Sequence, residues 1–576
     1  MSAEQLITEK TLLAVRDLYG TEAAASQVQV TTTRKEFEGD YTVVVFPLLK
    51  ISRTSPVATG EAIGRWLVAH CAEIRAFNAV QGFLNLSLDT AYWAGVLRDI
   101  AAAPDFGVLP PTGRRIMVEF SSPNTNKPLH LGHIRNNLLG DSVSRLLQAA
   151  GNEVIKVTLV NDRGVHICKS MYAWEQRFNG ATPESTGKKG DHLVGDCYVE
   201  YARMEKEDPS VIDKVHEMLV KWEEGDPQVR ALWEKMNGWV FDGFAQTYKA
   251  LGISFDKTYY EHDTYLLGKE LVRRGLDMGV FVRDADGSVW CDLTADGLDR
   301  KLLLRSDGTS VYITQDLGTA ERRFSEYKLD SHVYVVGDEQ NYHFQVLKLV
   351  LSKLGFDWAQ QIFHLSYGMV ELPEGKMKSR EGTVVDADDL IEKMYEEAKA
   401  TSEESGKLED VPAEERERLY RSIGLGALKY FILKVDPKKK MLFNPRESID
   451  FNGNTGPFIQ YTHARICSIL RKAAGQGACA RIQDGVVLSP KEVRLVQWLS
   501  AYPQRVAEAA AAYSPALMAN YAYDLAKEFN QYYHDTPVLK EPDAALKEMR
   551  LALIDTLASV LRKTTALLGM ELPARM

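Results

Sequence analysis

Between residues 116 and 160, the order of apolar and polar positions predicts a strand, a helix and a second strand. The run 116–121 is short and rich in β-forming residues, and 153–160 is a similar run. Between them, 131–150 carries apolar residues at helical spacing and stops at Gly151, a common helix end. A strand, a helix and a strand in about 45 residues predict an α/β fold with a parallel sheet.

Later segments extend this picture. Apolar runs at 333–336 and 362–370 are expected to add strands to the sheet, with helices between them. The stretch 188–260 is charged and helix-like, so we expect an insertion in the sheet domain. From residue 491 onward apolar positions recur at intervals of four, as in Leu517, Tyr521, Leu525 and Phe529. That periodicity predicts a C-terminal helical bundle.

A break rich in proline and glycine at 103–115 separates a first module from the sheet, because these residues forbid a continuous helix or a central strand. Before the break, β-rich runs at 41–46 and 83–88 mix with a helical run at 61–77, which predicts a small α+β domain. The expected parts are 1–110 as the N-terminal domain, 111–390 as the sheet domain with an insertion at about 188–260, 391–450 as a connecting helical segment and 451–576 as the helical domain.

Composition narrows the function classes. Of 576 residues, 45% are hydrophobic and 26% charged, which is typical of a globular chain. The 69 Lys and Arg against 79 Asp and Glu give a net charge of −10, so any nucleic-acid contact must rest on local cations. Six dispersed cysteines without a C-x-x-C pair argue against structural zinc and disulfides and favour a reducing cytoplasm. No run of about 18 apolar residues and no signal-peptide pattern occurs, so we expect no membrane association.

The segment 119–137, EFSSPNTNKPLHLGHIRNN, places two histidines, a glycine and a lysine where the first strand of the sheet gives way to its helix. Ligands of open α/β sheets bind at the carboxyl ends of the strands, and a helix N-terminus binds phosphate. His130 and His133 would share one face of the first turn and donate hydrogen bonds to an anion. Gly132 would leave room for a flat base. The H-x-G-H pattern alone is equally consistent with two solvated histidines.

Other nucleotide motifs fail. The Gly-Lys pair at 375–376 is no P-loop, because Met377 stands where Ser or Thr should ligate magnesium. The sequence has no complete G-x-G-x-x-G, zinc-protease or G-x-S-x-G pattern. The segment 375–382, GKMKSREG, is a basic loop that could stabilise the charge of a triphosphate as pyrophosphate leaves. The alternative is a solvated basic turn. Its three cations are Lys376, Lys378 and Arg380.

Taken together, H-L-G-H at 130–133 and K-M-K-S-R at 376–380 resemble the two nucleotide-binding motifs of class I aminoacyl-tRNA synthetases. Further segments resemble the arginyl-tRNA synthetase family: NDRG at 161–164, VYITQDLGTA at 311–320, VVGDEQNYHFQ at 335–345 and NTGPFIQYTHARI at 454–466. The resemblance runs from about residue 30 to the C-terminus. It implies a Rossmann-like catalytic domain, an α+β N-terminal domain that touches the tRNA elbow and an all-α anticodon-binding bundle.

The resemblance implies an ATP-dependent ligase that activates L-arginine as arginyl-adenylate and transfers it to the 3′ end of tRNA(Arg). The implied catalytic residues are Lys127, His130, His133 and Lys376. The implied ATP-binding residues are His130, Gly132, His133, Gly337, Lys376, Met377 and Lys378. The implied arginine-binding residues are Glu119, Ser122, Asn124, Tyr312, Asp316 and Gln340. In this chemistry the arginine carboxylate attacks the α-phosphate in line, and the protein mainly positions groups and stabilises charge.

The residues also suit arginine chemically, because a guanidinium is a planar set of donors that carboxylates and aromatic rings recognise well. Tyr312 and Asp316 are four residues apart on a predicted helix and hence on one face. By resemblance, Asp316 and Glu119 would grip the guanidinium, with Tyr312 alongside. Ser122, Asn124 and Gln340 would hold the amino and carboxylate ends. From spacing alone, Tyr312 and Asp316 are also compatible with an ordinary solvated helix pair.

The basic loop departs from the family pattern K-M-S-K-S, because Ser379 takes the place of the second lysine and Arg380 follows it. Among arginyl enzymes a lysine just before the histidine motif appears in its stead. Lys127 is placed for that role, so we expect it to be the compensating cation.

For tRNA, the resemblance implies that the helical C-terminal region reads the anticodon. Single-stranded bases stack on aromatic and apolar side chains, although most such side chains are core. The candidates are Tyr461, Tyr513, Tyr533 and Met576, and the candidate phosphate-binding cations are Arg322, Arg323, Lys438, Lys439 and Lys440. Resemblance also implies that bound tRNA is needed before arginine is activated. We expect ATP with Mg²⁺ as a substrate complex, no dedicated metal site, no tightly bound cofactor, and a monomer.

Two rival functions remain at this stage. A non-catalytic tRNA-binding paralogue would have lost the residues for catalysis, yet Lys127, Glu119 and H-L-G-H are intact. A class I synthetase of other specificity, such as the cysteinyl enzyme, should carry a zinc-binding cysteine set, which this sequence lacks.

Overall fold

The computed structural model describes residues 3–34, 36–371, 385–404 and 411–576. The basic loop 375–382, with Lys376, Met377 and Lys378, lies outside the described residues. The chain divides into two units, each made of segments distant in sequence. One comprises 1–106, 465–503 and 525–560, and the other comprises 107–464, 504–524 and 561–576. This division cuts through the predicted 451–576 domain, and the domain boundaries proposed from sequence stay predictions.

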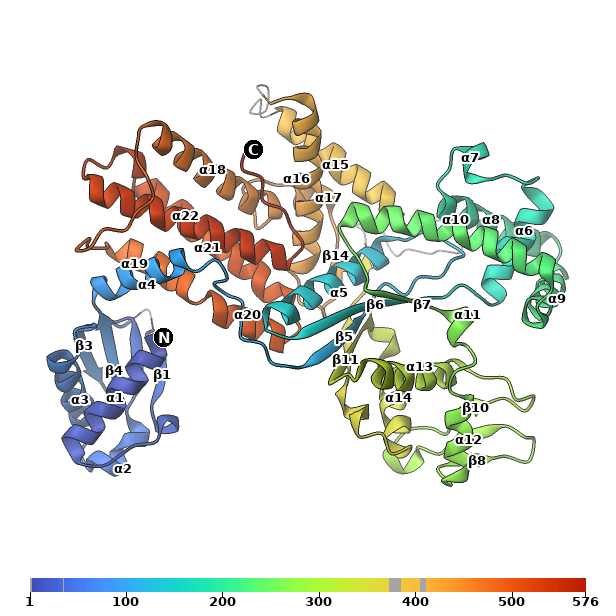
Figure 1. Cartoon of the computed structure of the whole chain (residues 1–576), viewed down its shortest axis with the longest axis horizontal. Coiled ribbons are helices and arrows are strands. Elements are labelled where there is room, and N and C mark those ends of the chain that lie inside the picture. Colours follow the sequence, from blue (N-terminus) through green and yellow to red (C-terminus); the bar gives the residue numbers. More distant parts are fainter. Residues whose placement is uncertain (1–2, 35, 372–384, 405–410) are drawn as a thin grey trace. The chain divides into compact units, whose positions relative to one another are not determined.

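The larger unit is built on a five-stranded sheet in the order β12-β11-β5-β6-β7, and every neighbouring pair is parallel (Figure 1). The predicted parallel α/β sheet is therefore confirmed. The strands are β5 (Arg115–Glu119), β6 (Glu153–Val160), β7 (Lys257–Tyr260), β11 (Ser331–Gly337) and β12 (Ile362–Tyr367). The chain runs outward from β5 through β6 to β7 and then returns to β11 on the other side of β5. That reversal marks the switch point between β5 and β11, and open α/β sheets bind ligands at the carboxyl ends of strands at such a point.

Helices cover both faces of the sheet. On one face, α5 (Leu131–Ala149) approaches so closely that a Cβ on Gly140 would lie 2.2 Å from the Phe120 ring. On the other, α13 (Tyr312–Tyr327) and α14 (Asn341–Lys353) share a core with Met117 and Val157. Alternate strand residues point to opposite faces, so both faces of a central strand are apolar.

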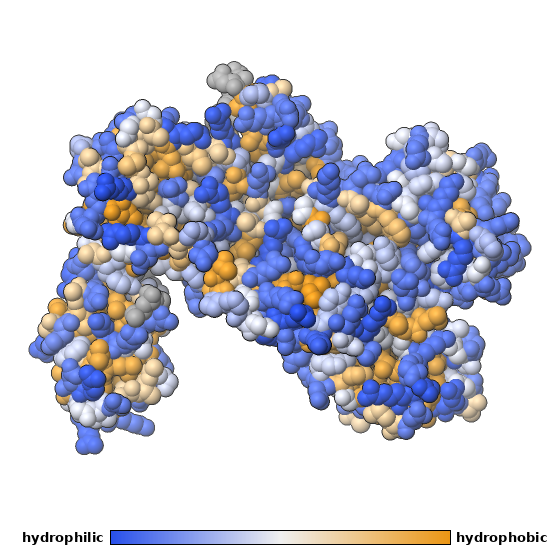
Figure 2. Space-filling view, in the orientation of Figure 1, coloured by the Kyte–Doolittle hydropathy of each residue, from blue (hydrophilic) through white to orange (hydrophobic). Residues whose placement is uncertain are grey.

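Between β6 and β7 lies a helical insertion whose α8 packs against α6 and α10. Its visible surface over α9 and α10 is largely hydrophilic, which agrees with the charge of the segment (Figure 2). The helices are α6 (Val165–Arg177), α7 (Pro183–Thr186), α8 (Gly190–Glu207), α9 (Val211–Glu224) and α10 (Pro227–Leu251).

The rest of the larger unit consists of smaller elements. The strands β8 (Phe281–Arg283), β9 (Val289–Cys291) and β10 (Lys301–Leu304) form an antiparallel sheet, and β13 (Val370–Glu371) pairs with β14 (Met441–Leu442) in parallel. The remaining helices are α11 (Glu261–Thr264), α12 (Lys269–Asp277), α15 (Ala387–Glu404), α16 (Ala413–Leu433), α17 (Pro445–Ser448) and most of α20 (Tyr502–Ala511).

The smaller unit has a four-stranded antiparallel sheet in the order β1-β2-β4-β3. Its C-terminal helix α19 packs against α4, and Gln497 donates a hydrogen bond to Asp40 (2.7 Å). The N-terminal elements are α1 (Ala3–Tyr19), β1 (Gln29–Thr32), β2 (Tyr41–Val44), α2 (Leu49–Ser52), α3 (Pro56–His70), β3 (Ile74–Val80), β4 (Phe83–Leu88) and α4 (Thr90–Ala102). The C-terminal helices are α19 (Pro490–Ser500) and parts of α18 (Gly456–Gly475), α21 (Pro515–Asp535) and α22 (Ala544–Leu567).

One predicted element is wrong in this unit. The helical run 61–77 continues only to His70, and Cys71 then adopts an extended conformation before β3. Phe77 packs from β3 onto α3, where a Cβ on Gly64 would lie 2.4 Å from its ring. The apolar residues of the run thus serve two packed elements, and periodicity could not separate them. Among the described helices, none is both long and apolar enough to span a membrane.

Candidate active site

The polar residues singled out in the sequence gather at the carboxyl edge of the five-stranded sheet. Glu119 ends β5, Gly337 ends β11, and Tyr367 ends β12. Asp162 follows β6, and Glu261 follows β7. Since parallel strands share one carboxyl edge, residues from segments more than 200 positions apart lie along the same edge of the sheet.

The turn after β5 has an unusual backbone. Ser121 and Ser122 have φ angles of 75° and 46°, a left-handed conformation that costs free energy in non-glycine residues. Asn136 of α5 holds this turn: its amide oxygen accepts from the Ser121 N–H (2.5 Å), and its amide nitrogen donates to the Val335 carbonyl (2.7 Å) and the Tyr367 hydroxyl (3.1 Å). One side chain therefore connects the ends of three strands.

His130 and His133 begin α5 as a reciprocal cap. The Nδ1 atom of His130 accepts from the Gly132 N–H (3.1 Å), and that of His133 accepts from the His130 N–H (3.2 Å). Burial lowers the pKa of His130 to about 4, helped by the charge of Lys127, and burial also lowers the pKa of His133 well below its usual range. Both rings are neutral near pH 7 with Nδ1 as acceptor, so each carries its proton on Nε2. The Nε2 protons are thus left for a ligand, and the predicted donation to an anion stays a prediction.

Gly132 lies next to the His130 ring. A Cβ at this position would stand 2.9 Å from Cε1 and 3.1 Å from Nδ1 of His130, closer than such atoms approach. The glycine thus permits the imidazole to fold over the helix end and cap it. This gives it a structural purpose besides the space for a base that the sequence suggested.

Lys127 lies beside these histidines. Its charge lowers the pKa of both His130 and His133, and burial lowers the pKa of Lys127 itself. Lys127 and His130 line a cavity of about 520 Å³ that the insertion also borders, through His192 and Tyr198. Within the described part of the chain, no hydrogen bond is recorded for the Lys127 ammonium, so it can serve an anionic ligand.

The expected guanidinium pocket lies along α13. Tyr312, at its first turn, is 82% exposed, and Asp316 one turn later is hydrogen bonded to His343 Nε2 (2.6 Å). The Glu119 carboxylate forms an ion pair with Arg323 of the same helix, whose guanidinium is 1% exposed. Burial raises the pKa of Glu119, the charge of Arg323 lowers it, and that of Asp316 raises it. Glu119 and Asp316 therefore lie close together, but Glu119 already holds a guanidinium of this chain.

Sequence reasoning missed a third carboxylate in this region. Burial raises the pKa of Glu261 to about 7; the charge of Arg163 lowers it, whereas Asp162 and Asp316 raise it. Glu261 follows β7, a four-residue strand too short to stand out in the sequence. One sequence signal for Glu261 was the NDRG motif at 161–164, because its Asp162 and Arg163 act on the pKa of Glu261. Asp162 is fully buried and binds His262 through Nδ1 (2.5 Å) and N–H (3.1 Å).

The other expected arginine and ATP residues also lie at this edge. Asn124 forms a parallel bridge with Asn161, next to the end of β6. Gln340 is exposed in the turn after β11, and buried Gly337 precedes that turn. Ser122 donates its N–H to Thr158 Oγ1 (3.2 Å). Their roles in binding arginine and ATP stay predictions.

The candidate tRNA residues have mixed surroundings. Tyr513 stacks on Phe363 of β12 at 4.4 Å, and Tyr533 stacks on Phe529 at 5.8 Å, so each ring already has an aromatic neighbour. Tyr461 meets the edge of Phe451, and Met576 is half-buried. For Arg323, the expected phosphate contact is wrong, because its guanidinium is buried against Glu119.

Arg135 is a further residue that the sequence analysis did not single out. It is fully buried, and its guanidinium donates to the carbonyls of Gly368 (2.7 Å), Met369 (3.3 Å), Pro437 (3.1 Å) and Lys439 (2.9 Å). Burial lowers its pKa to about 10. One sequence signal for Arg135 was its position in HIRNN at 133–137, between His133 of the cap and Asn136. It ties the start of α5 to the segments around β13 and β14.

Comparisons with known proteins agree with this geometry. The family model described as "tRNA synthetases class I (R), catalytic domain" matches residues 105–444, and the "DALR anticodon binding domain" matches 459–576. The arginine–tRNA ligases of Parabacteroides distasonis and Bacteroides thetaiotaomicron are each 54% identical over 597 aligned residues, which cover 100% of both chains. That of Flavobacterium psychrophilum is 50% identical, again with complete coverage.

Solved structures lead to the same family. The Thermus thermophilus arginyl-tRNA synthetase superposes with a TM-score of 0.78 at 26% identity, with 100% of each chain covered. The arginyl-tRNA synthetase of Plasmodium falciparum shares the fold, with a TM-score of 0.77 at 20% identity and coverage of 100% of this chain and 99% of that one. With its class I sheet, its histidine cap and these relatives, the chain belongs to the arginyl-tRNA synthetases, the ATP-dependent ligases that join arginine to its tRNA.

Proposed function

We propose that the carboxyl edge of the five-stranded sheet is where this ligase forms arginyl-adenylate, before the arginyl group passes to the 3′ end of tRNA(Arg). AMP and pyrophosphate are the other products. The observation that carries this assignment is that the neutral donors His130 and His133, with Lys127 beside them, lie at the same sheet edge as Glu119, Asp316 and Glu261. The two histidines and Lys127 suit a polyphosphate. The three carboxylates suit a guanidinium.

On the ATP side, His130 and His133 donate from Nε2 to phosphate oxygens, and Gly337 borders the nucleotide. Lys127 supplies the positive charge that the family pattern otherwise places in the second lysine of the basic loop. Lys376, Met377 and Lys378 complete the ATP-binding set. Charge near a developing pyrophosphate lowers the barrier most when it is held in place before the reaction.

On the arginine side, Asp316 and Glu261 grip the guanidinium, and Tyr312 covers it. Glu119, held by its ion pair with Arg323, borders the pocket. Ser122, Asn124 and Gln340 hold the amino and carboxylate ends. With the carboxylate so fixed, one of its oxygens attacks the α-phosphorus in line, the bond to the bridging oxygen breaks, and pyrophosphate leaves with that electron pair.

Around this reaction we place tRNA(Arg), with the helical C-terminal region at the anticodon, through Tyr461, Tyr513, Tyr533 and Met576, and the N-terminal domain at the elbow. In this proposal bound tRNA is required for activation. ATP enters as its Mg²⁺ complex, and the chain acts as a monomer. The dispersed cysteines, with no C-x-x-C pair, support a reducing cytoplasm as its location.

The test is ATP–pyrophosphate exchange with each of the twenty amino acids, with and without total tRNA. We expect exchange with arginine alone, and only when tRNA is present. Exchange without tRNA would support the ligase activity but contradict the requirement for bound tRNA. Exchange with another amino acid would overturn the pocket assignment, and no exchange under any condition would indicate a non-catalytic paralogue.

A further inference from the structure

A short segment that begins at Val385 pairs with the backbone around His130. The Leu131 N–H donates to the Val385 carbonyl (3.0 Å), and the Ala387 N–H donates to the Leu129 carbonyl (3.0 Å). His130 and Asp386 are thus antiparallel bridge partners. The backbone of the capping histidine is held by a segment far along the chain.

The same segment begins α15. Asp386 accepts from the N–H groups of Asp388 (2.8 Å) and Asp389 (3.3 Å), which is a helix cap. The first turn of α15, and the Asp388 side chain on it, is therefore fixed relative to the His130 bridge.

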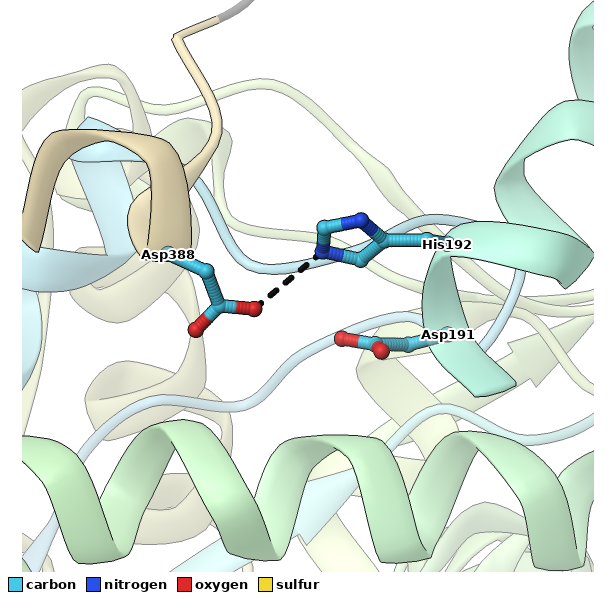
Figure 3. Close-up of side chains that lie close together, drawn as sticks. All are labelled: Asp191, His192 and Asp388. Carbon is cyan, nitrogen blue, oxygen red and sulfur yellow. Dashed lines mark hydrogen bonds and ion pairs between the residues drawn. The ribbon is translucent and has the colours of Figure 1, made fainter. Parts of the chain in front are cut away.

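The insertion grips this turn from the other side. Lys189 Nζ lies 2.6 Å from Asp388 Oδ2, and Thr247 of α10 donates to Asp388 Oδ1 (2.9 Å). His192 Nε2 lies 3.1 Å from Asp388 (Figure 3). The same atom lies 3.3 Å from Asp386. Lys189 and His192 stand at the start of α8, so two helices of the insertion meet one turn of α15.

Asp191 completes the cluster and is fully buried. Its Oδ2 accepts from Lys189 (3.1 Å), and its carboxylate points toward Asp388 (Figure 3). Gly243 makes room for it, because a Cβ there would lie 2.3 Å from Asp191 Oδ1. Asp191, His192 and Asp388 have the donor types of a metal site. The Lys189 ammonium already lies between the two carboxylates, however, so the chain supplies the cation itself.

The electrostatics stabilise the contacts of Asp388 with Lys189 and His192. Burial raises the pKa of Asp388, but hydrogen bonds from His192 and Lys189 outweigh it and lower that pKa to about 2. The hydrogen bond to Asp388 raises the pKa of His192, burial lowers it, and the charge of Asp386 raises it. Partly buried ion pairs of this kind are costly to break from one side, because the remaining charge is left without its partner.

We propose that Lys189, His192, Asp386 and Asp388 form a clamp that positions His130 and Lys127 for ATP. The inference rests on the proposed function, since it assigns positioning residues for that reaction. His192 and Asp386 line the same cavity as Lys127 and His130. Groups that stabilise charge in a transition state must be held within a fraction of an ångström, and a misplacement of about 1 Å can lower a rate about 100-fold.

The test compares Lys189→Met and Asp388→Asn with two controls on the same helices, Lys206→Met and Asp389→Asn, whose side chains are exposed. In tRNA-dependent exchange, we expect the clamp variants to lower kcat about tenfold and raise KM for ATP, with KM for arginine changed less than twofold. Lys189→Arg and Asp388→Glu should recover part of kcat. Clamp variants equal to the controls, or an equal rise in both KM values together with a lower Tm, would overturn the clamp.

Amide hydrogen exchange separates this inference from the proposed function. In the protein without substrates, we expect the Leu131 amide to exchange faster in Lys189→Met and Asp388→Asn than in the wild type and the controls. If the wild type catalyses no exchange of pyrophosphate, the proposed function fails, and the amide measurement still decides whether the clamp holds His130. Unchanged protection of Leu131 in both variants would overturn it.

Discussion

His130 and His133 contribute donors and no charge, because each ring accepts a backbone N–H at Nδ1 and is neutral. The positive charge at this end of the site must then come from other residues. Lys127 is a described cation whose charge lowers the pKa of both rings. Catalytic charge and catalytic hydrogen bonding are thus assigned to different side chains.

For this reason Lys127→Ala should lower kcat/KM for ATP about 100-fold, the size of effect seen when one group that stabilises transition-state charge is removed. The Kd for arginine, measured by calorimetry, should change less than twofold. Lys188→Ala is a matched control, because Lys188 lines the same cavity but is paired with Asp196 (2.6 Å). Equal losses in ATP use and arginine binding, or no loss in either, would remove the compensating role.

We predict that Glu261 gives the proposed arginine pocket a pH dependence. Its pKa of about 7 means that it is protonated below neutrality and ionised above it. Only the ionised form attracts a guanidinium strongly, so KM for arginine should fall as pH rises from 6 to 8, with proton release on binding. Glu261→Gln should remove this slope and raise KM at pH 8 about tenfold, since a hydrogen bond to a charged group contributes about 1.5–3 kcal/mol.

The control for that measurement is Asp263→Asn, an exposed carboxylate two residues away. It should keep the wild-type slope. A slope that survives in Glu261→Gln would assign the titration to another group and leave Glu261 outside the pocket.

At the scale of elements, α13 serves the site at one end and the core at the other. Tyr312 and Asp316, which are predicted to bind arginine, lie on its first two turns, whereas Arg323 pairs with Glu119 at the end of β5. The helix thereby fixes the carboxylate that ends the central strand. Periodicity predicted correctly that Tyr312 and Asp316 lie on one helix, but gave no sign of the ion pair.

Breaking that pair from one side should be costly. Arg323→Met leaves Glu119 buried without its cation, so we expect a loss of about 3–5 kcal/mol in the free energy of unfolding, measured with urea at pH 7.5. The double variant Glu119→Gln with Arg323→Met should recover much of that loss, because no buried charge remains. If Arg323→Met alone is as stable as the wild type, the ion pair does not contribute to the free energy of unfolding.

At the scale of the whole molecule, an acidic chain must bind a polyanion through local cations. Lys438, Lys439 and Lys440 are exposed together just before β14. We predict that replacing all three by alanine raises KM for tRNA about tenfold and flattens its salt dependence, while KM for arginine and for ATP at saturating tRNA stay within twofold. The measurement is aminoacylation across a salt series.

A second triple variant supplies the control for charge. Lys206, Lys249 and Lys269 are exposed elsewhere on the chain, and their replacement removes the same net charge. If both triple variants weaken tRNA binding equally, the net charge of the chain governs binding. The lysines at 438–440 then make no specific contact with tRNA.

The sequence by itself determined the local features of this protein. The strand, helix and strand at 115–160 follow from relations between residues two to four positions apart, which the chain shows directly. The motif spacing then indicated the family and placed Lys127, His130, His133, Tyr312 and Asp316. The short strands β3 and β7 were not predicted, because four to seven residues carry little periodic signal.

Only the tertiary structure decided which distant residues meet. Glu119 with Arg323, Asn136 with Tyr367, and Lys189 with Asp388 join positions whose separation obeys no repeat. Their protonation and pairing depend on burial, and burial depends on how the sheet, α13 and the insertion pack. A sequence fixes the residues available to a site, whereas the packing of its elements fixes the distances and the dielectric surroundings that make those residues act together.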